Sequence, residues 1–272
     1  MKHIVSFSGG RTSAYMSFIL KGMYPDAEFI FMDTGAEHPK TYEFIKKCDD
    51  YFNLDLKVIR PIVDPEMGKG MQHQVITTNE MGWDLSTMKA LVKKYGTFNY
   101  LNPLCTTMLK TRTAQSYLKK YKGENVTQWI GIRCDEKRRL KDKTGFAYLA
   151  DICDFEKQDV LQWWEEQPFD LELEEHLGNC IFCVKKNANR IALAQRDEPE
   201  LFNEWSDMVN SGRQRGDIPK DVIYRGDLTP TGVVNFYADY QRDDIKQTMR
   251  MYKDKQTICS ESCESFQMEM VL

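Results

Sequence analysis

The chain of 272 residues has no long apolar run and no strong excess of charge of one sign. No apolar stretch approaches the roughly 20 residues of a membrane-spanning helix, so no membrane association is expected. A strand is expected almost directly after Met1, which leaves no room for a cleaved leader. The net charge of −4 gives no general reason to expect binding to nucleic acid, whose phosphates are bound by Lys and Arg. Internal repeats, low-complexity segments and a recognisable linker are also missing.

The sequence does contain eight cysteines and enough residues for a sizeable hydrophobic core. Thiols in a chain without an export signal indicate a reducing compartment, and the expected location is therefore the cytoplasm. In such a compartment the thiols are available to bind metal.

Apolar runs alternate with helical patterns in the first half of the chain. Strands are predicted near 3–7, 27–33, 55–60 and 126–132, and helices near 13–23, 39–52, 86–95, 110–121 and 156–167. This alternation predicts an α/β fold with a doubly wound, mainly parallel sheet, followed by a helical C-terminal part. We expect a nucleotide-binding domain over residues 1–175. A cysteine-rich helical region over 176–272 is expected to pack on the same site.

The segment between the first strand and the first helix has the composition of a phosphate-binding loop. Its two adjacent glycines let the backbone approach an anion closely, and hydroxyl-bearing residues surround them. The first N–H groups of the helix point at such an anion, and the helix dipole adds attraction. A simple capped turn is the alternative for an isolated Gly-Gly pair. The predicted phosphate-binding residues are Ser6, Ser8, Gly9, Gly10, Arg11, Thr12 and Ser13.

A second polar loop follows the second predicted strand. Asp33, Thr34 and Gly35 leave that strand at the same edge of the sheet as the glycine loop. A carboxylate at this edge binds a ribose hydroxyl or a Mg²⁺ ion on the phosphates. The alternative is a helix cap, in which Asp33 or Thr34 holds the first turn of the next helix. We favour the ligand site over the cap.

Together these segments resemble the PAPS reductase branch of the adenine-nucleotide α-hydrolases. The glycine loop at 6–13 and the pattern D-T-G-x-x-x-P-x-T at 33–41 are both similar to that family. Residues 129–136 are similar to its strand ending in G-x-R-x-x-E, and residues 178–183 to the Cys-x-x-Cys of its iron–sulfur members. The resemblance covers about residues 1–190. It implies that the chain binds an adenine nucleotide, either ATP or PAPS.

Basic residues near the expected nucleotide form the next group of candidates. Lys110 follows Cys105 in a stretch similar to the family's cysteine-containing segment with its basic position. Gly131 and Arg133 end the fourth predicted strand, and Arg139 follows shortly after. Because guanidinium groups bind sulfate and phosphate oxygens in a bidentate manner, Arg133 and Arg139 are expected to hold the anion. Arg133 is also expected to neutralise charge that develops on the leaving or sulfur-bearing group.

Two close pairs of cysteines indicate a metal site. A Cys-x-x-Cys turn brings two thiolates to one metal, and four thiolates suit either Zn²⁺ or an iron–sulfur cluster. The resemblance favours a [4Fe–4S] cluster held by Cys105, Cys180 and Cys183, with Cys263 or Cys259 as the fourth ligand. The family has two adjacent cysteines upstream, whereas this chain has the single Cys105.

Three functions are compatible with these motifs. The glycine loop resembles the S-G-G of ATP pyrophosphatases, which favours cleavage of ATP coupled to sulfur transfer. Reduction of a sulfonucleotide to sulfite is the alternative. The thioredoxin-coupled reductases of the family use a C-terminal cysteine as a nucleophile, and Cys263 is the candidate here although its surroundings do not match that motif. The third function is a non-catalytic nucleotide sensor with a structural metal. The expected partners are a sulfur- or electron-donor protein and a nucleic-acid substrate delivered by another protein.

Overall fold

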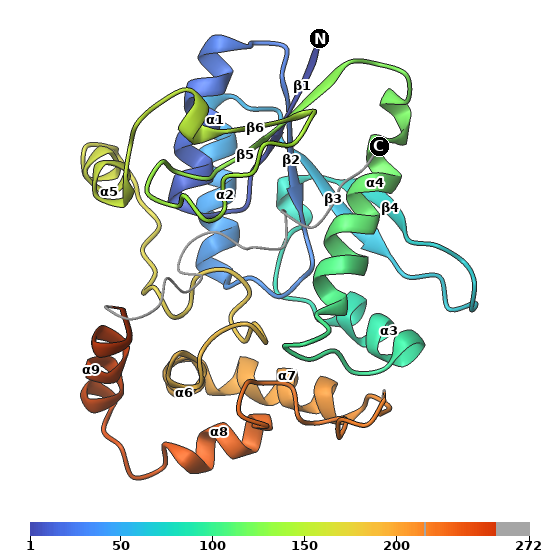
Figure 1. The fold of residues 1–272 in the computed structure, drawn as a ribbon, viewed down its shortest axis with the longest axis vertical. Coiled ribbons are helices and arrows are strands. Elements are labelled where there is room, and N and C mark those ends of the chain that lie inside the picture. The colour runs from blue at the N-terminus through green and yellow to red at the C-terminus, as the bar shows by residue number, and fades with distance from the viewer. Residues whose placement is uncertain (215, 254–272) are drawn as a thin grey trace.

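The computed structural model describes residues 1–214 and 216–253, and it places helices on both faces of a six-stranded sheet (Figure 1). The strands are β1 (Lys2–Ser6), β2 (Glu28–Met32), β3 (Lys57–Ile62), β4 (Gln72–Ile76), β5 (Val126–Ile130) and β6 (Phe146–Tyr148). Their order across the sheet is β4-β3-β2-β1-β5-β6. Every neighbouring pair is parallel except β3 and β4, which are antiparallel. The predicted doubly wound, mainly parallel sheet is therefore confirmed.

The helices before the C-terminal part flank this sheet. They are α1 (Arg11–Met23), α2 (Pro39–Phe52), α3 (Ser86–Tyr95), α4 (Thr113–Leu118) and α5 (Lys157–Glu165), and a π-helix, Cys105–Arg112, leads directly into α4. Val5 of β1 faces an apolar cluster that includes residues of α1, α2 and α5. Ile4, its neighbour in sequence, faces a cluster that includes residues of α4. Both side chains are fully buried, which explains why this parallel strand is apolar without alternation.

The direction of the chain in the sheet determines where a ligand can bind. From β1 the chain proceeds through β2 and β3 to β4 at one edge, and it then returns to β5 on the other side of β1. In open α/β sheets such a reversal leaves a crevice at the carboxyl ends of the strands. The loops after β1 and β5 meet at this crevice, as the resemblance to nucleotide-binding proteins implies.

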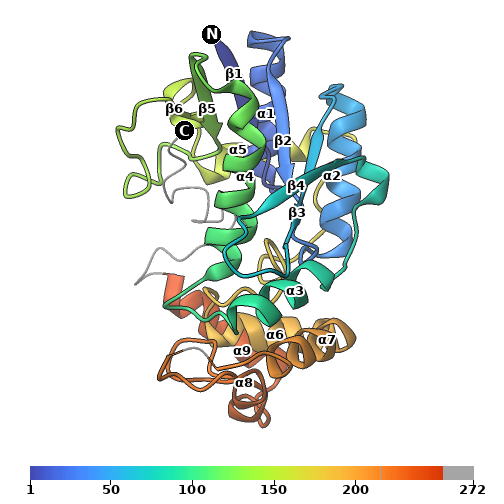
Figure 2. The ribbon, with the colours of Figure 1, turned by 90° about the vertical axis from the view of Figure 1, so that its right-hand side faces the viewer.

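A helical part gathers at one end of the sheet, together with α3 (Figure 2). It contains α6 (Ala188–Asp197), α7 (Pro199–Asn210), α8 (Pro230–Phe236) and α9 (Arg242–Lys253). Its core includes the fully buried Phe182, Trp205 and Tyr224, and this cluster also takes in residues of α3 and of the π-helix. The predicted helical C-terminal part is thus present. The domain division at residue 175 stays a prediction.

Among the helices that the structure describes, none combines the length and the apolar character that crossing a membrane requires.

Candidate functional site

The glycine loop is held together by the hydroxyl of Ser13. Ser13 Oγ accepts hydrogen bonds from the backbone N–H of Ser8 at 3.0 Å and from Ser8 Oγ at 2.9 Å, and it donates to the carbonyl of Gly10 at 2.9 Å. Gly9 adopts a positive φ of +81°, a backbone conformation that favours glycine. Gly10 is the N-cap residue of α1, and it has no side chain that could accept a hydrogen bond from the first N–H groups of the helix. The first N–H groups of the helix are therefore left for a ligand.

An open hollow lies directly in front of this loop. Its volume is about 410 Å³ with its mouth included. It is lined by Ser8, Gly9, Gly10, Arg11, Thr41, Leu171, Leu173, Glu174, Glu175, Gly178 and Asn179. The glycine loop thus shares one hollow with the turn that immediately precedes Cys180.

Arg11 is engaged with the wall of the hollow. Its guanidinium donates two hydrogen bonds to the Asp170 carboxylate and a third to the carbonyl of Leu171. The side chain therefore holds the segment around residue 170 against the start of α1. Its predicted contact with phosphate stays a prediction, and it requires the guanidinium to release or share Asp170.

The end of β5 meets the start of α1 closely. A Cβ atom on Gly131 would lie 3.1 Å from the Cα of Ser13, so the absence of a side chain permits this approach. Just beyond, Arg133 donates to Thr12 Oγ1 at 3.0 Å, and its Nε atom donates to Asp135 at 2.9 Å. Arg133 is almost completely buried. The structure thus brings four of the predicted site residues, Thr12, Ser13, Gly131 and Arg133, together at the rim of the glycine loop.

Arg139 and Arg133 both contact the carboxylate of Glu136. Arg139 Nη1 donates to Glu136 Oε1, and Glu136 Oε2 accepts the backbone N–H of Arg133 at 3.2 Å. The predicted anion-binding role of Arg139 stays a prediction.

Asp33 occupies the predicted position but has only internal partners. Its Oδ1 accepts the N–H of Gly35 at 3.0 Å and the hydroxyl of Tyr42 at 3.2 Å. Its Oδ2 accepts Nε and Nη2 of Arg60 at 3.1 and 2.7 Å. A carboxylate offers about four acceptor positions, and all of them are used. Asp33 therefore orients the loop after β2, and contact with ribose or metal would require it to give up a partner.

The same loop reaches Cys180 through backbone and side chain. Glu37 forms an isolated antiparallel bridge with Cys180, and the N–H of Ile181 donates to the carbonyl of Ala36 at 3.1 Å. The Cys180 thiol donates to Glu37 Oε1 at 3.3 Å, and Lys110 Nζ lies 3.7 Å from that oxygen. The predicted residues Lys110 and Cys180 therefore meet at Glu37. This role of Glu37 could not be predicted from sequence, because no local pattern pairs residues 143 positions apart.

Two further residues of the loop after β2 approach other segments: Thr34 approaches the cysteine turn, residues 178–183, and Gly35 approaches Asp84. Thr34 Oγ1 lies 3.9 Å from Cys180 Sγ, at the limit of a hydrogen bond to sulfur. Gly35 adopts a positive φ of +76°, and an added Cβ would lie 1.9 Å from the carbonyl oxygen of Asp84. Only glycine fits at that position, so Gly35 serves the close approach of two backbone segments.

Lys186 supports the cysteine turn from beneath. Its Nζ donates to the carbonyls of His176 and Ile181 at 2.7 and 2.9 Å. Burial lowers the pKa of this ammonium to about 8, while the nearby Cys183, Cys180 and Glu37 act in the opposite direction. The sequence does not distinguish Lys186 from the adjacent Lys185, since lysines are usually exposed.

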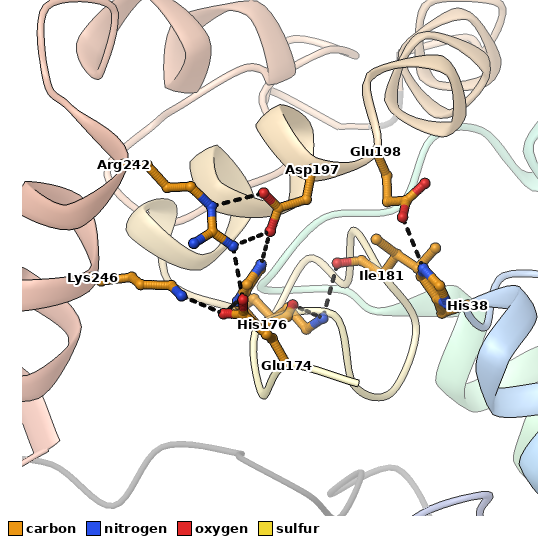
Figure 3. Close-up of polar contacts among 9 residues, drawn as sticks. His38, Glu174, His176, Ile181, Asp197, Glu198, Arg242 and Lys246 are labelled. Carbon is orange, nitrogen blue, oxygen red and sulfur yellow. Dashed lines mark hydrogen bonds and ion pairs between the residues drawn. The ribbon is translucent and has the colours of Figure 1, made fainter. Parts of the chain in front are cut away.

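A polar network fixes the base of the same turn (Figure 3). His176 Nε2 lies 2.6 Å from Asp197 Oδ2, and Arg242 contacts both Asp197 and Glu174. Burial lowers the pKa of His176, although its hydrogen bond to Asp197 raises it. Next to Asp197 in the chain, Glu198 lies 2.9 Å from Nε2 of His38, the residue that caps α2. Asp197 and Glu198, at the C-terminal end of α6, thus link the segment around His176 to the start of α2.

The structure describes only some of the predicted metal ligands. Cys105 and Cys180 both pack at the edge of the apolar cluster that contains Phe182. Within residues 1–214 and 216–253, no group of three His, Cys, Asp or Glu side chains is arranged to hold a metal ion. Cys259 and Cys263 lie outside the described residues. The cysteine-ligated cluster therefore stays a prediction.

Comparison with known proteins agrees with the motifs. The protein-family model of the phosphoadenosine phosphosulfate reductase domain matches residues 2–149. A protein named "Uncharacterized nin region protein ORF290" from Escherichia phage lambda is 39% identical over 98% of this chain and 96% of its own length. A phosphoadenosine 5'-phosphosulfate reductase of Thiocapsa roseopersicina is 38% identical, but over 24% of this chain and 27% of its own length.

Among solved structures, a phosphoadenylyl-sulfate reductase from Candida auris in complex with phosphate aligns with 61% of this chain and 72% of its own. The TM-score is 0.39 and the sequence identity is 15%. The family model covers more than half of the chain, and it includes both polar loops and the strand that ends before Arg133. The chain belongs to the phosphoadenosine phosphosulfate reductase domain family.

Proposed function

We propose that this chain is an enzyme of sulfur metabolism that cleaves ATP to AMP and pyrophosphate and uses the activated substrate for sulfur transfer. One observation carries the proposal: the phosphate-binding loop and the turn before Cys180 line the same hollow. A nucleotide held at the start of α1 would therefore present its phosphates next to a thiol. Family membership supports an adenine nucleotide as the ligand.

The residues of the glycine loop would bind the phosphates. The N–H groups at the start of α1 are donors, the hydroxyl of Ser8 would become one by turning from Ser13 Oγ to the phosphate, and the helix dipole favours an anion there. Arg133 lies behind Thr12, and its guanidinium is oriented by Asp135. We expect it to stabilise negative charge on the departing group from this fixed position.

Reduction of a sulfonucleotide to sulfite is the second candidate. It is favoured by the family's name and by relatives named as phosphoadenosine 5'-phosphosulfate reductases. The two reactions differ in their products, because ATP cleavage releases pyrophosphate and sulfonucleotide reduction releases sulfite. A non-catalytic nucleotide sensor is the remaining candidate of another class.

The [4Fe–4S] cluster is part of the proposal, with zinc as the alternative. Thiolates of Cys105, Cys180 and Cys183 have the chemistry that such a cluster requires, and Cys263 or Cys259 would complete the set. A bound cluster would supply sulfur coordination or electron transfer beside the nucleotide. We also propose a cytoplasmic location, a donor protein for sulfur or electrons, and a nucleic-acid substrate presented by another protein.

The first test is anaerobic purification followed by calorimetric titration with ATP and with PAPS, and by assays for pyrophosphate and sulfite. Binding of ATP with release of pyrophosphate is expected. Ser8→Ala should weaken nucleotide binding by about tenfold, because it removes one donor to a charged group. Ser17→Ala is the matched control, since Ser17 is buried one turn further along α1 and donates to the carbonyl of Ser13. A wild-type protein that binds neither nucleotide would refute the proposed function.

Metal analysis of the same sample tests the cluster. About four irons per chain are expected, with loss of iron in Cys180→Ala and retention in Cys153→Ala, a partly buried cysteine outside the predicted set. Iron at the wild-type ratio in Cys180→Ala would remove the cluster from the proposal. One zinc per chain and no iron would indicate that the cysteines bind a structural zinc ion in place of the cluster.

A further inference from the structure

Two cysteines outside the predicted metal site follow the neighbouring strands β5 and β6. These strands are parallel, and beyond their ends the N–H of Ala150 donates to the carbonyl of Ile132 at 3.0 Å. Cys134 stands two residues after Ile132, and Cys153 stands three residues after Ala150. The two segments that leave the sheet side by side therefore each carry a thiol.

Both thiols contact the same short stretch of backbone. Cys134 Sγ donates to the carbonyl of Asp154 at 2.9 Å and to that of Phe155 at 3.4 Å. Burial raises the pKa of the Cys153 thiol, a backbone hydrogen bond at Phe155 lowers it, and charge on Asp154 and on Cys134 raises it again. The two thiols therefore meet at the backbone of residues 154–155, where each lies within the electrostatic reach of the other. Both are free cysteines in this structure.

The surroundings of these two thiols differ from those of an ordinary core cysteine. Cys134 and Cys153 are half-buried, whereas Cys48 is fully buried in an apolar cluster. A small reagent can therefore reach the pair. Burial and the neighbouring carboxylates, that of Glu156 first, raise the pKa of Cys134 and hold it as a thiol. The same carboxylates favour a cationic reagent over an anionic one.

We propose that Cys134 and Cys153 form a redox-active dithiol, which closes into a disulfide by exchange with a small cationic disulfide. One cysteine gives its proton to solvent and attacks a sulfur of the reagent, which forms a mixed disulfide and releases the first thiolate. The other cysteine then attacks the protein sulfur of that mixed disulfide, and the second thiolate leaves. Overall the two cysteines lose two protons and two electrons, and the reagent is reduced to two thiols.

The bridge joins two segments that both contact α1. Arg133 Nη1 donates to Thr12 Oγ1 at 3.0 Å, and the ring of Phe155 stacks on that of Tyr15 with 5.1 Å between the ring centroids. Oxidation therefore ties the loop that carries Arg133 to the segment before α5, behind the helix that starts at the glycine loop. The covalent link also restricts the unfolded chain, which stabilises the fold.

The test is anaerobic incubation of the full, reduced chain with cystamine, followed by alkylation of the remaining thiols, trypsin digestion and mass spectrometry. Trypsin places the two cysteines in separate peptides, 134–137 and 144–157, because it cleaves after Arg133, Lys137, Lys143 and Lys157. These two peptides should be recovered joined by a disulfide, and dithiothreitol should separate them. The midpoint of thermal unfolding of the oxidised chain should rise by about 5 °C.

Single substitutions identify the two steps of the exchange. In Cys134→Ser and in Cys153→Ser the remaining cysteine should keep one cysteamine as a stable mixed disulfide, because the thiol that resolves it is absent. Neither variant should show the rise in unfolding midpoint. Cys48→Ala is the matched control, since it removes a thiol far from the surface and should still form the bridge.

Three results would overturn the proposal. The first is recovery of both wild-type peptides as separate alkylated thiols or separate mixed disulfides. The second is a bridge from Cys134 or Cys153 to any other cysteine of the chain. The third is the expected bridge with a lowered unfolding midpoint, which would show that the fold must be distorted to join the two thiols.

Discussion

The guanidinium of Arg11 binds the carboxylate of Asp170 through two parallel hydrogen bonds, Nε to Oδ1 at 2.7 Å and Nη2 to Oδ2 at 2.8 Å. The two residues are 159 positions apart in sequence. The pair joins the first turn of α1 to the segment that lines the other side of the hollow. The width of the hollow therefore depends on this contact.

Asp170→Asn should lower the free energy of unfolding by about 1 kcal/mol, a modest value because Asp170 is more than one third exposed. Nucleotide affinity should be retained or raised, since Arg11 is released toward the anion. Urea denaturation and calorimetric titration measure the two effects. A tenfold loss of affinity at unchanged stability would instead show that Asp170 itself contacts the ligand.

Gly35→Ala should be severely destabilising, by about 3 kcal/mol or more, because the new methyl group would overlap the carbonyl of Asp84 and the backbone has a positive φ. Gly68→Ala is the matched control. Gly68 also has a positive φ, of +87°, but no atom lies within 4 Å of an added Cβ. The Gly68→Ala variant should lose only about 1 kcal/mol of its free energy of unfolding. Thermal unfolding of both variants separates the effect of the atomic overlap from the cost of a positive φ for alanine. Similar losses of stability in the two variants would contradict the close packing at Gly35.

Asp33→Asn should lower the free energy of unfolding by about 2 kcal/mol, because it leaves Arg60 facing an uncharged amide inside the loop after β2. Affinity of the folded fraction for nucleotide should change by less than about threefold, since the carboxylate is fully used within the protein. Asp55→Asn, in an exposed pair with Lys57, should have little effect on either quantity. A large loss of affinity with unchanged stability would support the ligand-binding role predicted from sequence.

Stability should depend on pH through His176. Burial lowers its pKa in the folded state below the ordinary value of 6.5, so the unfolded chain binds the proton more readily. The free energy of unfolding should therefore be highest above pH 6.5 and fall as the pH drops through the folded pKa. His176→Gln should show a smaller loss between pH 7.5 and 5.5 in urea denaturation. An identical pH slope in both proteins would exclude His176 as the titrating group.

Much of the local structure could be predicted because its causes are local. The helix predicted over 39–52 is present as Pro39–Phe52, with Pro39 at its first position and His38 as its cap. The helix predicted over 86–95 is also present with those bounds. The helix predicted over 110–121 differs, since a π-helix over Cys105–Arg112 precedes α4 and a 3₁₀ turn follows it. Periodicity does not distinguish these forms.

The features that could not be predicted depend on distant partners. The antiparallel edge strand β4 was missed because its residues are mostly exposed and its apolar residues are limited to Val75 and Ile76. For Asp33 the sequence offered a ligand site or a helix cap, and it gave no sign of the partner that the structure shows, Arg60, 27 residues away. Lys186 and Glu37 acquire their positions at the cysteine turn from tertiary packing, and no spacing rule indicates either.

The main-chain bond from Ile181 to Ala36 has a practical consequence for protein engineering. Replacing side chains leaves such a bond intact, so an alanine scan would pass over this connection without detecting it. Proline at position 181 would open it, because proline has no backbone donor. Transfer of the cysteine turn into another protein would therefore require both facing backbone segments. A graft of residues 180–183 alone would lack the hydrogen bond from Ile181 to Ala36.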